Sequence, residues 1–148
     1  MNRRIITVSL LIFLSATGAE ELGNEAAINK RQTAFKAMDN EVEIIEEALD
    51  AGKSADNEAI RKAAEQIILH SKSLTGTFVT DSYRGKTKAK KKIWSKWADF
   101  TERQQTLITS AEYLLQASKT GNSEDLETAF EALTDNCSGC HRRYKQIF

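Results

Sequence analysis

The chain has 148 residues, with 21 basic and 21 acidic side chains, two cysteines and no proline. A formal net charge of zero argues against a general nucleic-acid-binding protein, because such proteins carry a basic surface that neutralises phosphates. The length suits one domain with one hydrophobic core, and the absence of proline and of alternating apolar runs predicts an all-α fold.

Residues 1–19 have the pattern of a cleaved secretory signal peptide. Arg3 and Arg4 are followed by an apolar run over 5–14 and by small residues over 15–19. The apolar run is about half the roughly 20 residues that a membrane span needs, which leaves an uncleaved anchor as the weaker alternative. We therefore expect export to a bacterial periplasm and a single mature domain over 20–148, with no membrane span after cleavage.

Two amphipathic helices are predicted next. The first covers about 24–51 and ends at Gly52, and the second starts near 55–57 and ends at Gly76. Their expected inner faces are Ile28, Phe35, Met38, Val42, Ile45 and Leu49 in the first, and Ile60, Ala64, Ile67, Ile68, Ser71 and Leu74 in the second. Residues 75–86 lack this periodicity and predict a long connection, with Phe78 and Tyr83 folded back onto the helices.

Two further helices complete the predicted fold. The third covers about 87–119 and ends at Gly121, and Asn122 or Ser123 is expected to cap the fourth. The inner faces are expected to hold Ile93, Trp97, Phe100, Leu107, Ile108, Ala111, Leu114 and Leu115, and then Leu126, Ala129, Phe130, Leu133, Cys137, Cys140, His141 and Tyr144. Four helices with three connections predict an antiparallel four-helix bundle.

Residues 137–141 read C-x-x-C-H, the attachment pattern for c-type haem. The thiols of Cys137 and Cys140 would add to the two vinyl groups of one porphyrin, and His141 would be the axial ligand of its iron. On a helix these residues lie at i, i+3 and i+4, so they project from one face toward one ligand. Because the chain has only two cysteines, the pattern predicts one covalent haem c per chain.

Other chemistries for the two cysteines are less well supplied. A structural zinc site needs about four ligands, whereas the chain has two cysteines and two histidines, and His70 is far away in the sequence. A thioredoxin-like redox pair belongs after a strand, but this pattern lies in a helical segment. A disulfide between Cys137 and Cys140 would close only a very short loop.

The chain resembles the class II cytochromes c, and among them the cytochrome c′ family. The resemblance rests on KRQTAFKAM at 30–38, Ile-Trp at 93–94, and the haem pattern followed by RRYK at 142–145, near the end of the last helix. It implies that Phe35 faces the iron on the side opposite His141. It also implies that Arg31 meets a haem propionate and that Lys145 lies beside the axial histidine, where the family usually has arginine.

The side of the haem opposite His141 decides between two functions. A phenyl ring has no lone pair to give, so Phe35 there predicts a five-coordinate, high-spin iron behind an apolar cap, which disfavours dioxygen. The resemblance then implies binding of nitric oxide, for storage, transport or detoxification, alongside possible electron exchange. The alternative is a six-coordinate, low-spin electron carrier that uses Met38. The sequence shows no acid–base or nucleophilic group of residues that would predict an enzyme.

Two expectations concern partners. The resemblance implies a homodimer, and a carrier of electrons would also meet a redox partner protein. The segment 84–92 has six basic residues and no acidic one. It is either a solvated loop and helix start or a docking surface for an acidic partner or an anionic surface.

Overall fold

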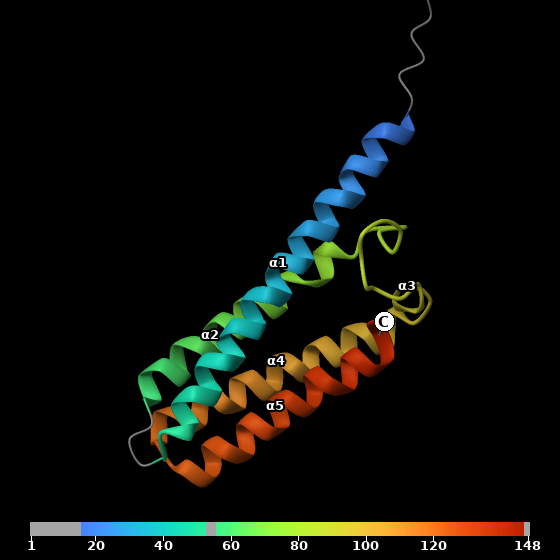
Figure 1. The fold of residues 1–148 in the computed structure, drawn as a ribbon. Helices are drawn as coiled ribbons and strands as arrows, with labels where there is room; N and C mark the ends of the chain where they lie inside the picture. The colour runs from blue at the N-terminus through green and yellow to red at the C-terminus, as the bar shows by residue number, and fades with distance from the viewer. Residues whose placement is uncertain (1–15, 53–55, 147–148) are drawn as a thin grey trace, which may run out of the picture.

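The computed structural model describes residues 16–52 and 56–146 and shows an antiparallel four-helix bundle (Figure 1). Its long helices are α1 (Ala16–Asp50), α2 (Asn57–Ser73), α4 (Trp97–Thr120) and α5 (Ser123–Tyr144). A 3-10 turn, η2 (Thr75–Thr77), and a short helix, α3 (Lys92–Ser95), lie in the connection between α2 and α4. The predicted signal peptide lies, up to residue 15, outside the described residues.

One apolar core runs along the bundle axis. It includes six fully buried aliphatic side chains, contributed by all four long helices: Ile45, Ile60, Ile67, Leu114, Leu126 and Leu133. Burying each such side chain contributes about 1.5–3 kcal/mol, so the predicted apolar stripes account for the packing of the four helices. Within the described residues, no helix is long and apolar enough to cross a membrane.

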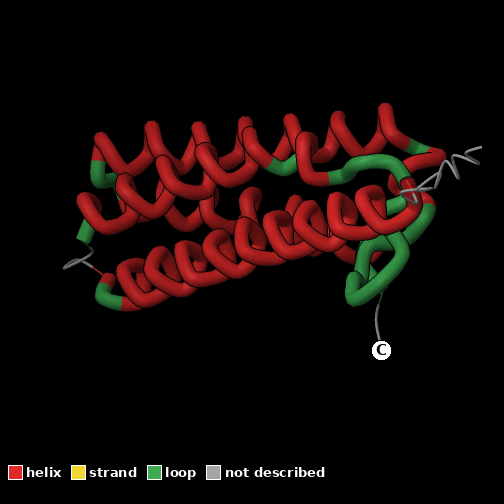
Figure 2. The backbone as a smooth tube through the Cα atoms, turned by 90° about the horizontal axis from the view of Figure 1, so that it is seen from above, coloured by secondary structure: helices red, strands yellow, loops and turns green. Residues whose placement is uncertain are grey.

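The two ends of the bundle differ in their connections (Figure 2). At one end the connections are short, since six residues separate α1 from α2 and two separate α4 from α5. Gly121 there has φ +70°, a left-handed conformation that favours glycine. At the other end, a long connection folds over the helices, and it buries Phe78 as predicted. Tyr83 is half-buried and packs on Trp94 within the same connection, with ring centroids 5.3 Å apart, and not on the long helices as predicted.

The third predicted helix starts later than its sequence pattern indicates. Residues 87–91 are not helical, and α4 begins only at Trp97. The reason is a long-range pairing: Lys90 N donates to Tyr144 O at 2.9 Å, and Gln146 N donates to Lys88 O at 2.8 Å. The backbone there pairs with the C-terminal segment, and α3 is separated from α4 by Lys96, whose φ and ψ are −128° and 42°.

Trp97 is a second departure from the predicted inner faces. Its side chain is 40% exposed, and its ring stacks on Phe100 with centroids 5.6 Å apart. Because Trp97 is the first residue of α4, it lies at the margin of the core, where one face of the indole remains in solvent.

Candidate functional site

A cavity at the end of the bundle with the long connection contains the cysteines and the histidine of the C-x-x-C-H pattern. Cys137 lines an inner lobe, whereas Cys140 and His141 line both this lobe and an adjoining outer lobe. Phe35, Asp39 and Phe100 are also common to both. The i, i+3, i+4 spacing on α5 therefore directs the three side chains into one site, as the pattern predicts.

The lobes differ in size and in chemistry. The inner lobe has a volume of about 60 Å³ and is largely apolar, and its lining includes Met38, Val42, Ile67, Leu107 and Leu133. The outer lobe has a volume of about 320 Å³, and Lys36, Lys88 and Lys145 are among the residues that line it. Ligand pockets typically have volumes of about 300–1,000 Å³. Of the two lobes, the outer one therefore reaches the size of a small-molecule site.

The two thiols are free and half-buried. Burial raises the pKa of Cys137 to about 11, and burial also raises the pKa of Cys140. Both thiols are therefore protonated at neutral pH, which disfavours a role as thiolate nucleophiles or metal ligands. Among the described residues, no cluster of three or more histidine, cysteine, aspartate or glutamate side chains could bind a metal ion.

His141 is held in its neutral form at the centre of the site. Burial is the largest cause that lowers its pKa, and the charge of Lys145 lowers it further, while Asp39 acts in the opposite sense. A neutral imidazole has a free lone pair on one ring nitrogen, which is the form that ligates a metal. The environment thus favours the protonation state that an axial ligand requires.

Phe35 lies opposite His141. Their ring centroids are 6.2 Å apart and the rings meet edge to face, with an interplanar angle of 64°. Because Phe35 comes from α1 and His141 from α5, the site is built between facing helices, as in other helical bundles that hold a cofactor.

The lining of the cavity fits a flat macrocycle. The Phe35 and His141 rings meet edge to face, and a ligating imidazole likewise presents its edge, through a ring nitrogen, to the group that it holds. Apolar side chains line the inner lobe and lysines line the outer one, which suits a group with an apolar body and an anionic edge.

Arg31 lines the outer lobe but is largely engaged by the long connection. The side chain is 2% exposed, and Nη1 donates to Thr77 O at 3.2 Å and to Ser82 Oγ at 2.9 Å. Nη2 donates to Ser82 O and, at 2.8 Å, to Thr87 Oγ1. These bonds leave Nε–H as the donor available to a propionate, so that contact stays a prediction.

Lys145 lies at the C-terminus of α5, and its backbone N donates to His141 O at 2.9 Å. Its exposed side chain is close enough to His141 to lower the pKa of the imidazole. The structure thus places this lysine on the same side of the cavity as His141, whereas its influence on a bound group stays a prediction.

Two features of the site were not singled out from the sequence. Asp39 lines both lobes, and its position one turn after Phe35 on α1 was the available signal. Asp99 of α4 accepts a hydrogen bond from the Tyr144 hydroxyl and ion-pairs with Arg103 and Arg143, at 2.9 Å and 3.1 Å. The contacts of Asp99 with Arg143 and Tyr144 join α4 to the end of α5, and no sequence spacing indicates them.

Comparison with known proteins identifies the family. A family model described as Cytochrome C′ matches residues 26–145, which is most of the chain. The chain belongs to the cytochrome c′ family. It is similar to cytochrome c′ of Pararhodospirillum photometricum, with 29% identity over 123 residues that cover 82% of this chain and 98% of the relative.

Solved structures of the family have the same fold. Cytochrome c′ of Shewanella frigidimarina is 28% identical and matches with a TM-score of 0.78, over 84% of this chain and 97% of the other. Cytochrome c′ of Rubrivivax gelatinosus is 25% identical and matches with a TM-score of 0.73, over 81% and 94% of the two chains. A nitric oxide complex of a cytochrome c′ variant from Alcaligenes xylosoxidans is 24% identical, with a TM-score of 0.76 over 84% and 97%. Family membership supports a c-type cytochrome with covalently bound haem c.

Proposed function

We propose that this c-type cytochrome has a five-coordinate, high-spin iron and that it binds nitric oxide, for storage, transport or detoxification, while remaining able to exchange electrons. One observation carries the proposal: Phe35, which cannot ligate a metal, is the side chain whose ring faces His141 in the cavity, at a centroid distance of 6.2 Å. Bound haem c supplies an iron that can take up a diatomic gas or an electron.

The chain's own residues have separate roles in this proposal. Cys137 and Cys140 would tether one haem from adjacent turns of α5, and the neutral imidazole of His141 would bind its iron. Phe35, which faces His141, would limit the space left for a further ligand. An apolar cap without a hydrogen-bond donor disfavours bound dioxygen more than nitric oxide, because dioxygen develops negative charge that needs a donor.

The contacts of Met38 favour the five-coordinate state over the six-coordinate alternative. Met38 is buried and lines the inner lobe, so its thioether is within the same cavity as His141. However, Ser71 Oγ of α2 donates to Met38 Sδ at 3.3 Å. The sulfur is therefore directed to α2, and its role is packing between α1 and α2.

The remaining parts of the proposal follow from the same assignments. The nitric oxide complex of the Alcaligenes xylosoxidans variant supports a gas ligand for this chain by analogy. The signal-peptide pattern supports a periplasmic location, and one C-x-x-C-H supports one haem per chain. A homodimer is proposed on family resemblance, and sedimentation across a range of concentrations tests it.

An absorption spectrum of the purified haem protein tests the proposal. We expect a high-spin spectrum in both oxidation states, unchanged in Met38→Leu, because Met38 is not a ligand. Phe35→Ala should increase the rate of carbon monoxide binding to the reduced protein by about tenfold or more, since the cap is removed. A low-spin spectrum with a methionine-to-iron charge-transfer band that Met38→Leu abolishes would establish the six-coordinate alternative instead.

A further inference from the structure

We call six lysines the basic rim: Lys36, Lys88 and Lys145, which line the outer lobe, and Lys86, Lys90 and Lys91, which neighbour Lys88 in the sequence. Five of these side chains are exposed and Lys90 is half-buried. They come from three parts of the chain: α1, the long connection and the C-terminal end of α5. Lys36, Lys88 and Lys145 line the outer lobe itself, in which His141 also lies.

One backbone bridge and two side-chain hydrogen bonds to backbone oxygens fix the three parts of the rim to one another. An isolated antiparallel bridge pairs Ala89 with Lys145, and Lys90 Nζ donates to Arg142 O at 3.2 Å. On the other side, Gln32 Nε2 of α1 donates to Lys86 O at 2.7 Å. The segments that carry the charges are therefore held in a defined arrangement beside the cavity, which a flexible basic loop would not provide.

Aromatic packing further supports the loop that carries the rim. Lys91 Nζ lies 5.3 Å from the centroid of the Tyr83 ring, and the Tyr83 and Trp94 ring centroids are 5.3 Å apart. Trp94 Nε1 donates to Val79 O at 3.0 Å. Within the described residues, Lys36, Lys86 and Lys91 are exposed and form no ion pair with a carboxylate, so no acidic side chain neutralises their charges.

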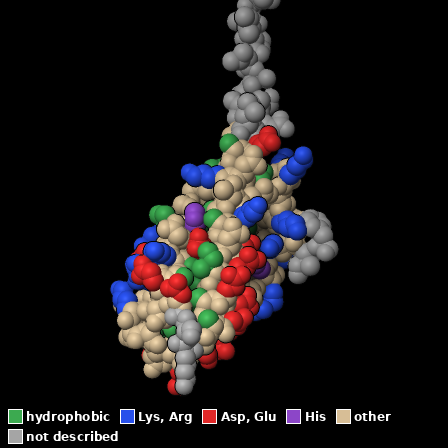
Figure 3. All heavy atoms as spheres, turned by 60° about the vertical axis from the view of Figure 1, so that its left-hand side comes forward, with side chains coloured by type: hydrophobic (Ala, Val, Ile, Leu, Met, Phe, Trp, Pro, Cys, Tyr) green, Lys and Arg blue, Asp and Glu red, His purple; other side chains and the backbone are tan. Residues whose placement is uncertain are grey.

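The opposite end of the bundle carries the opposite charge. Residues 41–50 of α1 hold five acidic side chains and no basic one, and residues 123–135 of α5 do the same. On the face seen in Figure 3, acidic and basic side chains are interspersed among other side chains and backbone, with small apolar groups between them. A charge separation along the bundle orients an approaching charged partner, because the field of the whole molecule acts before contact.

We propose that the basic rim docks the acidic face of a redox partner protein. The inference deepens the proposed function, on which it rests, because it places the partner beside the haem cavity, where an electron would travel the shortest distance. An anionic membrane is a poorer match: membrane-surface segments combine basic residues with large apolar ones, whereas Thr87 and Ala89 between the rim lysines are small.

Stopped-flow reduction of the haem-loaded protein tests the proposal, with an acidic plant-type ferredoxin as the probe. One electron leaves the reduced iron–sulfur cluster and one is taken up by the ferric cytochrome, with no proton or bond transferred. We expect the second-order rate constant to fall about tenfold between low and physiological salt, because salt screens exposed charges. Lys86→Gln/Lys91→Gln should lower the low-salt rate constant about three- to fivefold.

The matched control is Lys62→Gln/Lys119→Gln, which removes the same charge from α2 and α4 outside the rim. Its rate constant should stay within about twofold of the unsubstituted protein. Equal rate constants for the two double variants would overturn the proposal, because net charge alone would then act.

Binding to phosphatidylglycerol vesicles, measured by sedimentation, gives a second way to overturn the proposal. If Lys86→Gln/Lys91→Gln no longer sedimented with the vesicles while the control still did, the rim would be assigned to a membrane. The absorption spectrum of each variant reports separately on haem attachment and spin state, so failure of the proposed function would be visible on its own.

Discussion

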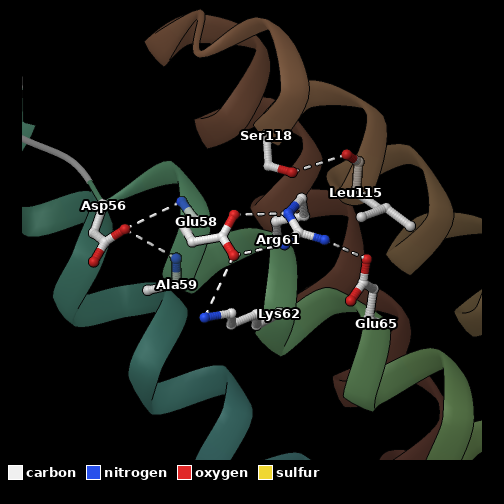
Figure 4. A network of polar contacts seen from close by, with 8 residues as sticks. All are labelled: Asp56, Glu58, Ala59, Arg61, Lys62, Glu65, Leu115 and Ser118. Atoms are coloured by element: carbon white, nitrogen blue, oxygen red, sulfur yellow. Dashed lines mark hydrogen bonds and ion pairs between the residues drawn. The ribbon is translucent and has the colours of Figure 1, made fainter.

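The end of the bundle with the short turns and the end with the cavity satisfy their polar groups over very different sequence distances. At the turn end, Asn122 Oδ1 accepts from Glu124 N at 2.9 Å and from Asp125 N at 3.1 Å. Asp56 Oδ1 likewise accepts from the backbone of Glu58 and Ala59, at 3.1 Å and 3.0 Å (Figure 4). These partners are two or three residues apart, which is the ordinary geometry of a helix N-cap.

At the cavity end, the partners are far apart in the sequence. Arg31 reaches residues that lie 46–56 positions later, and Tyr144 reaches Asp99 across 45 positions. The cavity is thus held open by contacts among α1, α4, α5 and the long connection. The turn end therefore stabilises the bundle through local contacts, whereas the cavity end shapes the site through contacts that exist only in the folded chain.

The largest expected effect is the loss of haem attachment at the cavity end. Cys137→Ala/Cys140→Ala removes both thiols that line the cavity. We therefore expect that no haem stays attached to the denatured chain of this variant. Haem staining of a denaturing gel measures this. Ser138→Ala is the control, because Ser138 lies between the cysteines but is exposed, and it should retain full staining.

A large effect on stability is expected at Arg31. Arg31→Met leaves four acceptors of the long connection without their donor, and we expect a loss of about 2–4 kcal/mol in the free energy of unfolding. Urea unfolding followed by far-ultraviolet circular dichroism measures the loss. The neighbouring Lys30 is exposed, so Lys30→Met should change stability by about 0.5 kcal/mol or less. Equal losses in the two variants would contradict the long-range role of Arg31.

A smaller effect is expected at the turn end. Asn122→Ala removes the side-chain cap of α5, which should cost about 1 kcal/mol, while the absorption spectrum of the haem protein stays unchanged. Ser123→Ala distinguishes the two cap positions that the sequence left open, and it should have almost no effect on stability. A spectral change in Asn122→Ala would show that the two ends are coupled.

The smallest effects concern acid unfolding, where each end has one carboxylate with a depressed pKa. The Tyr144 hydroxyl, and next the Arg103 guanidinium, lower the pKa of Asp99 to about 2, and Arg61 chiefly lowers that of Glu58 to about 2. Their contribution to stability is present above the unfolded pKa values near 4 and is lost as pH falls through about 2.

Asp99→Asn and Glu58→Gln should each make stability less dependent on pH between about 4 and 2, since each removes one carboxylate that takes up a proton late in folded protein. Unfolding midpoints in urea at a series of pH values measure this. Only Asp99→Asn should also alter the visible spectrum, because Arg103, which it holds, lines the inner lobe. An unchanged pH dependence in both variants would contradict the assignment of these pKa shifts.

Local patterns predicted the parts of the fold that depend on neighbours in the chain. The 3.6-residue periodicity indicated the apolar stripes of the four long helices, and Gly121 with Asn122 indicated the boundary between α4 and α5. The predicted start of the third helix was wrong because the backbone at Lys88 and Lys90 pairs with Gln146 and Tyr144, and no local propensity encodes this pairing. The predicted burial of Trp97 was wrong because periodicity alone does not locate the margin of a core.

The chemistry expected of this protein follows from neighbouring residues: two thiols and an imidazole at helical spacing indicate covalent haem and an axial histidine. The surroundings of that group depend on how the chain folds. Folding brought Phe35 to 6.2 Å from His141, directed Met38 to Ser71, buried Arg31 against the long connection and gathered the rim lysines from three segments. The physical reason is that covalent and coordinate chemistry requires residues at short spacing, whereas the shape, polarity and charge of a cavity arise from side chains that meet only when distant segments pack.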